Sequence, residues 1–214
     1  FMPAPQREIK RRIKSVGNIR QITRALQLVA TAKMKKSQKR ARDGRFFANA
    51  ALEILENLAG QKEVQEHILF QKFPAPAQLA ILITTNRGFC GGLNVAVLSL
   101  FSEFRTALKK EGKELAVITI GKKGGNFAKK TGIKIVADFS TNSEQLSASH
   151  IGAIERIATD EFLQKNYNAA HIFYTHFIST ISQATRRVQL LPLDKNLIAK
   201  QREKTVKKEQ AQPI

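Results

Sequence analysis

The chain has 214 residues, enough for one ordinary domain with an extension or for two small domains. Hydrophobic residues make up 43% of it, including 13 Phe, which supplies a core and excludes wholesale disorder. Lys and Arg number 36 against 17 acidic residues, so the net charge of +19 predicts that the partner is nucleic acid, an acidic protein face or an anionic membrane. A single cysteine excludes a disulfide framework, and no apolar run reaches the roughly 18 residues of a membrane span. We therefore expect no direct membrane insertion.

Positive charge is concentrated near the N-terminus, where residues 6–45 hold fourteen Lys and Arg but only Glu8 and Asp43 as acids. No Pro lies within residues 6–59, and apolar residues recur at spacings of mostly three and four, which predicts one helix roughly 80 Å long. The apolar row is narrow, which is typical of a coiled coil and requires a second helix to cover it. A helix that breaks near Gly44 and folds back on the body is the alternative. In the first half the row consists of Ile9, Ile13, Val16, Ile19, Ile22, Leu26 and Val29.

A run of cations interrupts this row between Ala32 and Arg45. Seven cations on two to three helical turns repel one another unless an acidic surface faces them, although a plain solvated face is the alternative. The seven are Lys33, Lys35, Lys36, Lys39, Arg40, Arg42 and Arg45.

After Gly60 the pattern changes to strands that alternate with helices. This order predicts a mainly parallel sheet with right-handed crossovers and helices on both faces. The last strand follows its predecessor too closely for a helix, so we expect it to pair antiparallel at an edge. The predicted fold class is α/β: a long N-terminal coiled-coil helix plus a small Rossmann-like body with flanking helices. The expected strands are 79–84, 115–120, 133–139, 170–177 and 187–191, and the expected helices are 95–110, 124–131 and 150–164.

The body lacks the motifs of a nucleotide-binding enzyme. There is no G-x-x-x-x-G-K-[ST] loop, and the glycines of 87–94 have the wrong spacing for G-x-G-x-x-G. The four histidines show no metal-ligand spacing, and no His lies close to Cys90 in the sequence to serve as its base. We therefore expect no catalysis, no cofactor and no metal. A tight structural turn after the first strand is the favoured interpretation of Arg87, Gly88, Cys90, Gly91 and Gly92.

Several segments together carry a family resemblance. They are 7–16 (REIKRRIKSV), 21–26 (QITRAL), 28–34 (LVATAKM), 84–94 (TTNRGFCGGLN), 120–124 (IGKKG), 177–183 (FISTISQ) and 189–193 (QLLPL). Each is modest alone, but in this order along the chain they closely resemble the gamma subunit of rotary F-type ATP synthases. The resemblance spans residues 7–193.

The resemblance implies a central-stalk rotor subunit that binds no nucleotide catalytically. In that family the first and last helices form an antiparallel coiled coil inside a ring of alternating alpha and beta subunits. The α/β body joins an epsilon-type subunit and rests on the membrane c-ring, and proton flow turns the shaft to drive ATP synthesis. This implies a peripheral position on an energy-transducing membrane, at the cytoplasmic face of a bacterial plasma membrane or, alternatively, at the mitochondrial matrix face. The residues expected to face the alpha/beta ring are Ile9, Ile13, Val16, Ile22, Arg24, Leu26, Gln27, Lys33, Lys36, Lys39 and Arg40.

The expected domains are a shaft helix at 1–60, a body at 61–193 and a basic tail at 194–214 that is flexible or truncated. The tail has too few apolar residues to serve as the family's long C-terminal helix, so we expect a truncated chain, with a divergent short homologue as the alternative. A nucleic-acid-binding α/β protein with a basic arm is the alternative function. The charge favours it, but a helix in a DNA groove has no need of the apolar row.

Overall fold

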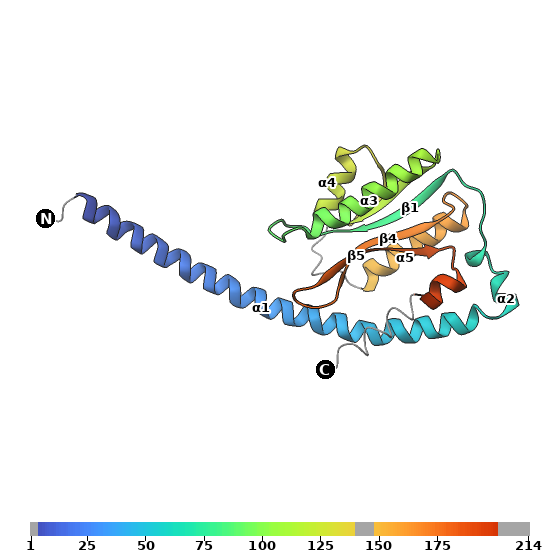
Figure 1. The fold of residues 1–214 in the computed structure, drawn as a ribbon, viewed down its shortest axis with the longest axis horizontal. Coiled ribbons are helices and arrows are strands. Elements are labelled where there is room, and N and C mark those ends of the chain that lie inside the picture. Colours follow the sequence, from blue (N-terminus) through green and yellow to red (C-terminus); the bar gives the residue numbers. More distant parts are fainter. Residues whose placement is uncertain (1–3, 140–147, 201–214) are drawn as a thin grey trace. The chain divides into compact units, whose positions relative to one another are not determined.

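The computed structural model describes residues 4–139 and 148–200 (Figure 1). The chain divides into two compact units, Phe1–Ala51 and Leu52–Ile214. Within the described ranges, no helix is both long enough and apolar enough to cross a membrane.

The helix α1 (Ala4–Leu58) contains 55 residues and is unbroken. It runs through Gly17 and Gly44, where an added Cβ would meet no atom within 4 Å. The prediction of one continuous helix is therefore confirmed, and the alternative of a break near Gly44 is wrong. None of the side chains described for residues 6–51 is buried. An isolated helix gains little from propensity alone, so α1 depends on surfaces that cover it.

The second unit contains one five-stranded sheet with the order β3-β2-β1-β4-β5. The β1–β2, β1–β4 and β2–β3 pairs are parallel, whereas β5 pairs antiparallel with β4 at the edge, as the sequence predicted. The strands are β1 (Ala77–Ile83), β2 (Glu114–Ile120), β3 (Lys134–Phe139), β4 (Ala170–Phe177) and β5 (Gln183–Leu191). The helices are α2 (Lys62–Gln65), α3 (Leu93–Lys110), α4 (Lys122–Lys130) and α5 (Ala148–Leu163), with a 3₁₀ turn η1 (Ile68–Phe70).

Apolar side chains cover both faces of the sheet, with α3 and α4 on one face and α5 on the other (Figure 1). On the first face Phe101 of α3 packs against Phe173 of β4, with ring centroids 5.3 Å apart. On the second face Phe162 of α5 is buried and packs against Phe73, with ring centroids 4.7 Å apart. The alternation of strands and helices therefore builds two apolar cores, one on each side of the sheet.

The structure corrects the length of the last strand. β5 begins at Gln183 rather than at residue 187, because its first four residues pair through the backbone with β4, as in the Phe177↔Gln183 pair. These residues are mainly polar, so an apolar pattern could not reveal them. Of the expected tail, residues 195–200 are helical, and the Asp194 carboxylate accepts hydrogen bonds from the first amides, at 2.8 Å from Asn196 N. The rest of the tail lies outside the described residues.

A buried histidine lies between α3 and the sheet. His171 of β4 stacks edge-on against Phe104, with ring centroids 4.9 Å apart, and its Nε2 lies 3.2 Å from Gln78 Oε1. Burial, and after it the positive charge of Arg187, lower the pKa of His171 to about 4. The imidazole is therefore neutral in the folded protein near pH 7.

We expect stability to fall with a His171-dependent step as the pH drops from 6.5 to 4. In this window the unfolded histidine binds a proton and the folded one, with a pKa of about 4, does not, so acid favours the unfolded state. The contribution is fully present above pH 6.5, and about 3 kcal/mol at most is lost by pH 4. Urea unfolding of the wild type and His171→Gln from pH 7.5 to 4 measures this. The stability difference between them should decline in acid, and a constant difference would contradict the prediction.

Candidate partner-binding surface

The apolar row of α1 is exposed along its whole described length. The exposed fractions of its members range from 54% for Val29 to 67% for Ile13. The members are Ile9, Ile13, Val16, Ile19, Ile22, Leu26 and Val29. A contiguous exposed apolar surface of this kind marks a place where another molecule or chain segment binds.

Two of the expected contact residues, Arg24 and Gln27, meet on the surface of α1. Arg24 Nη1 donates a hydrogen bond to Gln27 Oε1 at 3.2 Å, and Thr31 Oγ1 donates to the Gln27 carbonyl at 2.9 Å. The pair therefore presents a joined polar group beside the apolar row.

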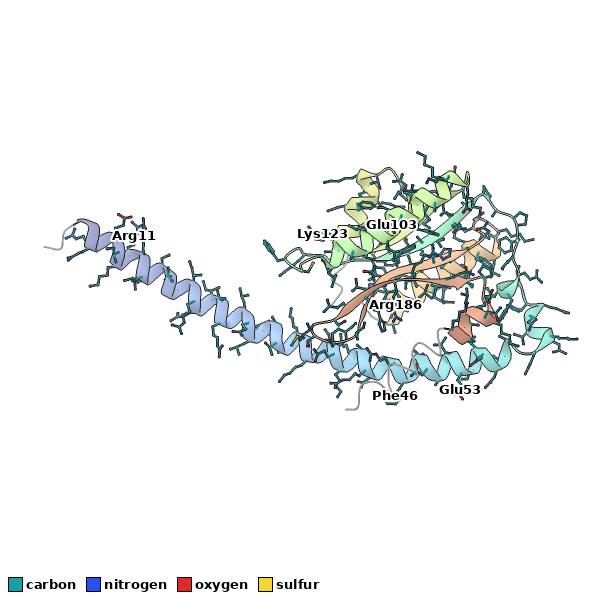
Figure 2. The ribbon with its side chains drawn as sticks, viewed as in Figure 1. Arg11, Phe46, Glu53, Glu103, Lys123 and Arg186 are labelled. Atoms are coloured by element: carbon teal, nitrogen blue, oxygen red, sulfur yellow. The ribbon has the colours of Figure 1, made fainter. Side chains whose placement is uncertain are left out.

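The basic collar, which we define as Lys33, Lys36, Lys39 and Arg40, is exposed on α1. It is followed by Phe46 and Phe47, whose exposed fractions are 81% and 80%, and Figure 2 shows Phe46 projecting from the helix. Exposed aromatic side chains next to cations are typical of binding surfaces. In the sequence, the signal for this part of the surface is two successive Phe residues directly after a cationic run.

Residues 84–92 connect β1 to α3, and Asn94 holds this connection together. Asn94 Nδ2 donates to Thr85 Oγ1 at 2.8 Å and to the half-buried Cys90 Sγ at 3.1 Å, while Asn94 Oδ1 accepts from Thr85 N. Thr85 Oγ1 also donates to the Arg87 carbonyl. The turn places Phe89 fully exposed, with a positive φ of 59°, and Gly91 takes a φ of 58°. The glycines mark this segment in the sequence, whereas no local pattern marks Thr85 and Asn94, whose hydrogen bonds form only in the fold.

The same turn occupies the first amides of α4, at the start of which Figure 2 shows Lys123. Lys122 N donates to Asn86 Oδ1 at 2.9 Å, and Lys123 N donates to the Thr85 carbonyl at 3.1 Å. Gly124 N donates to Thr84 Oγ1 at 2.7 Å. A phosphate bound at a helix N-terminus would need these amides, and in α4 they already donate to residues 84–86.

The described residues of the chain form no cluster of metal ligands. Among them, no three His, Cys, Asp or Glu side chains lie close enough to hold a metal ion. The surfaces that remain, an apolar row and a cationic run on α1, have the chemistry of protein–protein binding.

Comparisons with known proteins agree in pointing to one family. A family model described as ATP synthase matches residues 5–213. An ATP synthase gamma chain of Cupriavidus pinatubonensis is 34% identical over 205 residues, which cover 94% of this chain and 69% of the relative. A gamma chain of Acidithiobacillus ferrooxidans is 33% identical over 192 residues, which cover 90% of this chain and 67% of the relative. The chain thus spans about two thirds of the length of these relatives.

One solved structure supports the fold. A chain of the central stalk and c-ring of the Tetrahymena thermophila mitochondrial ATP synthase matches with a TM-score of 0.60 at 20% identity. The match covers 89% of this chain and 88% of that one.

We expect Gly121→Ala to destabilise the body far more than Gly112→Ala. Gly121 has a φ of +97°, and an added Cβ would overlap the Thr84 carbonyl, whereas Gly112, with a φ of +70°, has open space around its Cα. Gly112→Ala should therefore cost about 1 kcal/mol from backbone strain alone. Gly121→Ala should cost about 2–5 kcal/mol, because a steric clash adds to the strain. Urea unfolding measures both, and equal costs would show that the approach of Thr84 to Gly121 is not tight.

Proposed function

Because the chain belongs to the ATP synthase gamma chain family and is a non-catalytic rotor subunit of the central stalk, we propose that α1 is half of a shaft that turns inside a ring of alternating alpha and beta subunits. The exposed apolar row of α1 carries this proposal. A row more than half exposed over seven residues is unstable in water and implies that other helices and subunits cover it in the assembled enzyme.

The basic collar is the part of this shaft that faces acidic loops of the beta subunits. Its four cations lie within eight residues of one helix, so an opposing acidic surface relieves their mutual repulsion. Arg24 and Gln27, joined by their hydrogen bond, lie upstream on the same helix and belong to the ring contact. The apolar contact residues Ile9, Ile13, Val16, Ile22 and Leu26 complete it.

The α/β body has a different role, as the base that transmits rotation. In the body, the side chains of Thr84 and Asn86, just before the turn from Arg87 to Gly92, accept hydrogen bonds from the first amides of α4. These bonds hold the β1–α3 connection and α4 in a fixed relative position. We place an epsilon-type subunit and the membrane c-ring against the body, so that proton flow turns body and shaft together. The chain is then peripheral on an energy-transducing membrane, either at the cytoplasmic face of a bacterial plasma membrane or at the matrix face of a mitochondrion.

Co-purification tests the shaft proposal. The full chain, expressed with the alpha and beta ATP synthase subunits of its own organism, should elute with them as one complex that hydrolyses ATP. Alpha and beta expressed without it are the control. Elution of the chain apart from the two subunits at physiological salt would contradict the proposal.

We expect the basic collar to tolerate single changes and to fail on reversal. Partly solvated ion pairs contribute about 0–1 kcal/mol each, so single replacements of Lys33, Lys36, Lys39 or Arg40 by Ala should barely change complex yield. Reversal of all four to Glu sets like charges against the acidic loops and should strongly reduce both yield and ATP hydrolysis. Both are measured at low and high salt. A quadruple variant that assembles and hydrolyses ATP normally at low salt would show that the collar is a solvated face with no role in the ring contact.

A further inference from the structure

Two helix-to-strand connections of the α/β body have nearly the same sequence. Residues 109–113 (KKEGK) lead from α3 into β2, and residues 129–134 (KKTGIK) lead from α4 into β3. Each has two lysines and then a glycine with a positive φ, which is 70° at Gly112 and 65° at Gly132. Because β2 and β3 are parallel neighbours, both connections lie at the edge of the sheet where these strands begin. The repeat therefore gathers cations at one end of the body.

These lysines are not needed to cap the two helices. Both helices end with the bonds of a Schellman motif, in which backbone amides satisfy the last carbonyls. The amide of Gly112 donates to the Lys109 carbonyl at 3.1 Å, and the amide of Gly132 donates to the Lys129 carbonyl at 3.4 Å. The amide after each glycine donates to the residue before that lysine, at 2.9 Å in α3 and 3.1 Å in α4. The ammonium groups are therefore not required as hydrogen-bond donors to the helix ends.

A hollow of about 310 Å³ lies between the two connections, and it is strongly basic. Glu114 is the one acid among the residues that line it, and Glu111 offsets part of the charge, because its Oε2 lies 2.7 Å from Lys113 Nζ. One cation is held in place: the half-buried Arg105 of α3 donates from Nη2 to the Thr131 carbonyl of the other connection at 2.9 Å. We call this site the basic hollow, and its cations are Arg105, Lys109, Lys113 and Lys134.

This arrangement favours one class of anion. A phosphate group presents several strong acceptor oxygens and can meet cations from several sides, whereas a carboxylate presents two oxygens. A guanidinium group matches the geometry of phosphate, and Arg105 is already oriented by its bond to Thr131. None of the residues that line the basic hollow is aromatic, so its chemistry suits the phosphate itself rather than a nucleotide base.

We propose that the basic hollow is a phosphate-binding site, in which Arg105 orients the anion and Lys109, Lys113 and Lys134 neutralise its charge. A free phosphate compound and the headgroup of an anionic lipid present the same group, so both are sources that this site accepts. The site lies in the body and does not depend on the shaft proposed for α1. Phosphate binding and assembly with a ring are therefore separate results.

Glycine signals in nuclear magnetic resonance test the site on the full chain. The chain has 12 glycines, so selective ¹⁵N-glycine labelling gives few signals. Inorganic phosphate should shift the signals of Gly112 and Gly132 in a saturable way and leave those of Gly17 and Gly44 on α1 nearly unchanged. Equal shifts at all four glycines would show general charge attraction only and would overturn the proposal.

Glutamate at the same ionic strength is the control for the class of anion. We expect it to shift Gly112 and Gly132 much less than phosphate does, because its carboxylates present fewer oxygens to the cations. Shifts of the same two signals with equal affinity would instead assign the basic hollow to the carboxylates of an acidic peptide, and the phosphate site would be wrong.

Two matched double variants locate the binding. Lys109→Gln/Lys134→Gln removes two exposed lysines from the basic hollow, and Lys122→Gln/Lys123→Gln removes two exposed lysines from the start of α4. The hollow variant should bind phosphate about tenfold more weakly, because it loses charge-assisted hydrogen bonds, whereas the control variant should keep the affinity of the wild type. Equal losses in the two variants would contradict the proposal.

Vesicles then distinguish the two sources of phosphate. Sedimentation with phosphatidylcholine vesicles, with and without phosphatidylglycerol, is compared for the same two variants. The cations of α1 attract anionic vesicles equally in both variants, so a difference between the variants reports the basic hollow. Weaker binding of the hollow variant to the phosphatidylglycerol vesicles would identify a lipid headgroup as a ligand. Equal binding, together with the phosphate shifts at Gly112 and Gly132, would assign the site to a free phosphate compound.

Discussion

The constraint on which the rest of the molecule depends is that α1 is long and that its apolar side chains are exposed. A helix of 55 residues extends about 80 Å, more than a small α/β body can bury, and in this chain it exposes more than half of each apolar side chain along its first half. Such a helix gains its stability from what it binds. The chain is therefore a component whose fold is completed by assembly, which agrees with membership of the gamma chain family.

The body meets a different requirement, because it must hold its own shape. Its two apolar cores are closed by Phe101 and Phe173 on one face and by Phe162 on the other. At the end of β1 the hydroxyl of Thr84 accepts from Gly124 N, and Asn86 accepts from Lys122 N, so the β1–α3 connection and the start of α4 form one hydrogen-bonded unit. Gly121 and Gly124 permit this close packing, because an added Cβ at either would approach Thr84 to within about 3 Å or less.

Local sequence patterns predicted the secondary structure elements and the sheet type, but not the contacts that depend on how strands pair. The spacing of apolar residues and the lack of Pro predicted the continuous α1, and the alternation of strands and helices predicted a parallel sheet with an antiparallel last strand. The first half of β5 was not predicted, because residues such as Gln183 join the sheet through backbone hydrogen bonds and leave no apolar pattern in the sequence. The contact between Thr84 and Gly121 was not predicted, because it depends on how β1 and β2 pair. Ile83 lies opposite Ile120 in that pairing, which brings Thr84 to Gly121, 37 residues further along the chain. Once β1 and β2 are known to be neighbours, that contact follows. The partner-binding residues remain predictions, since they act on molecules other than this chain.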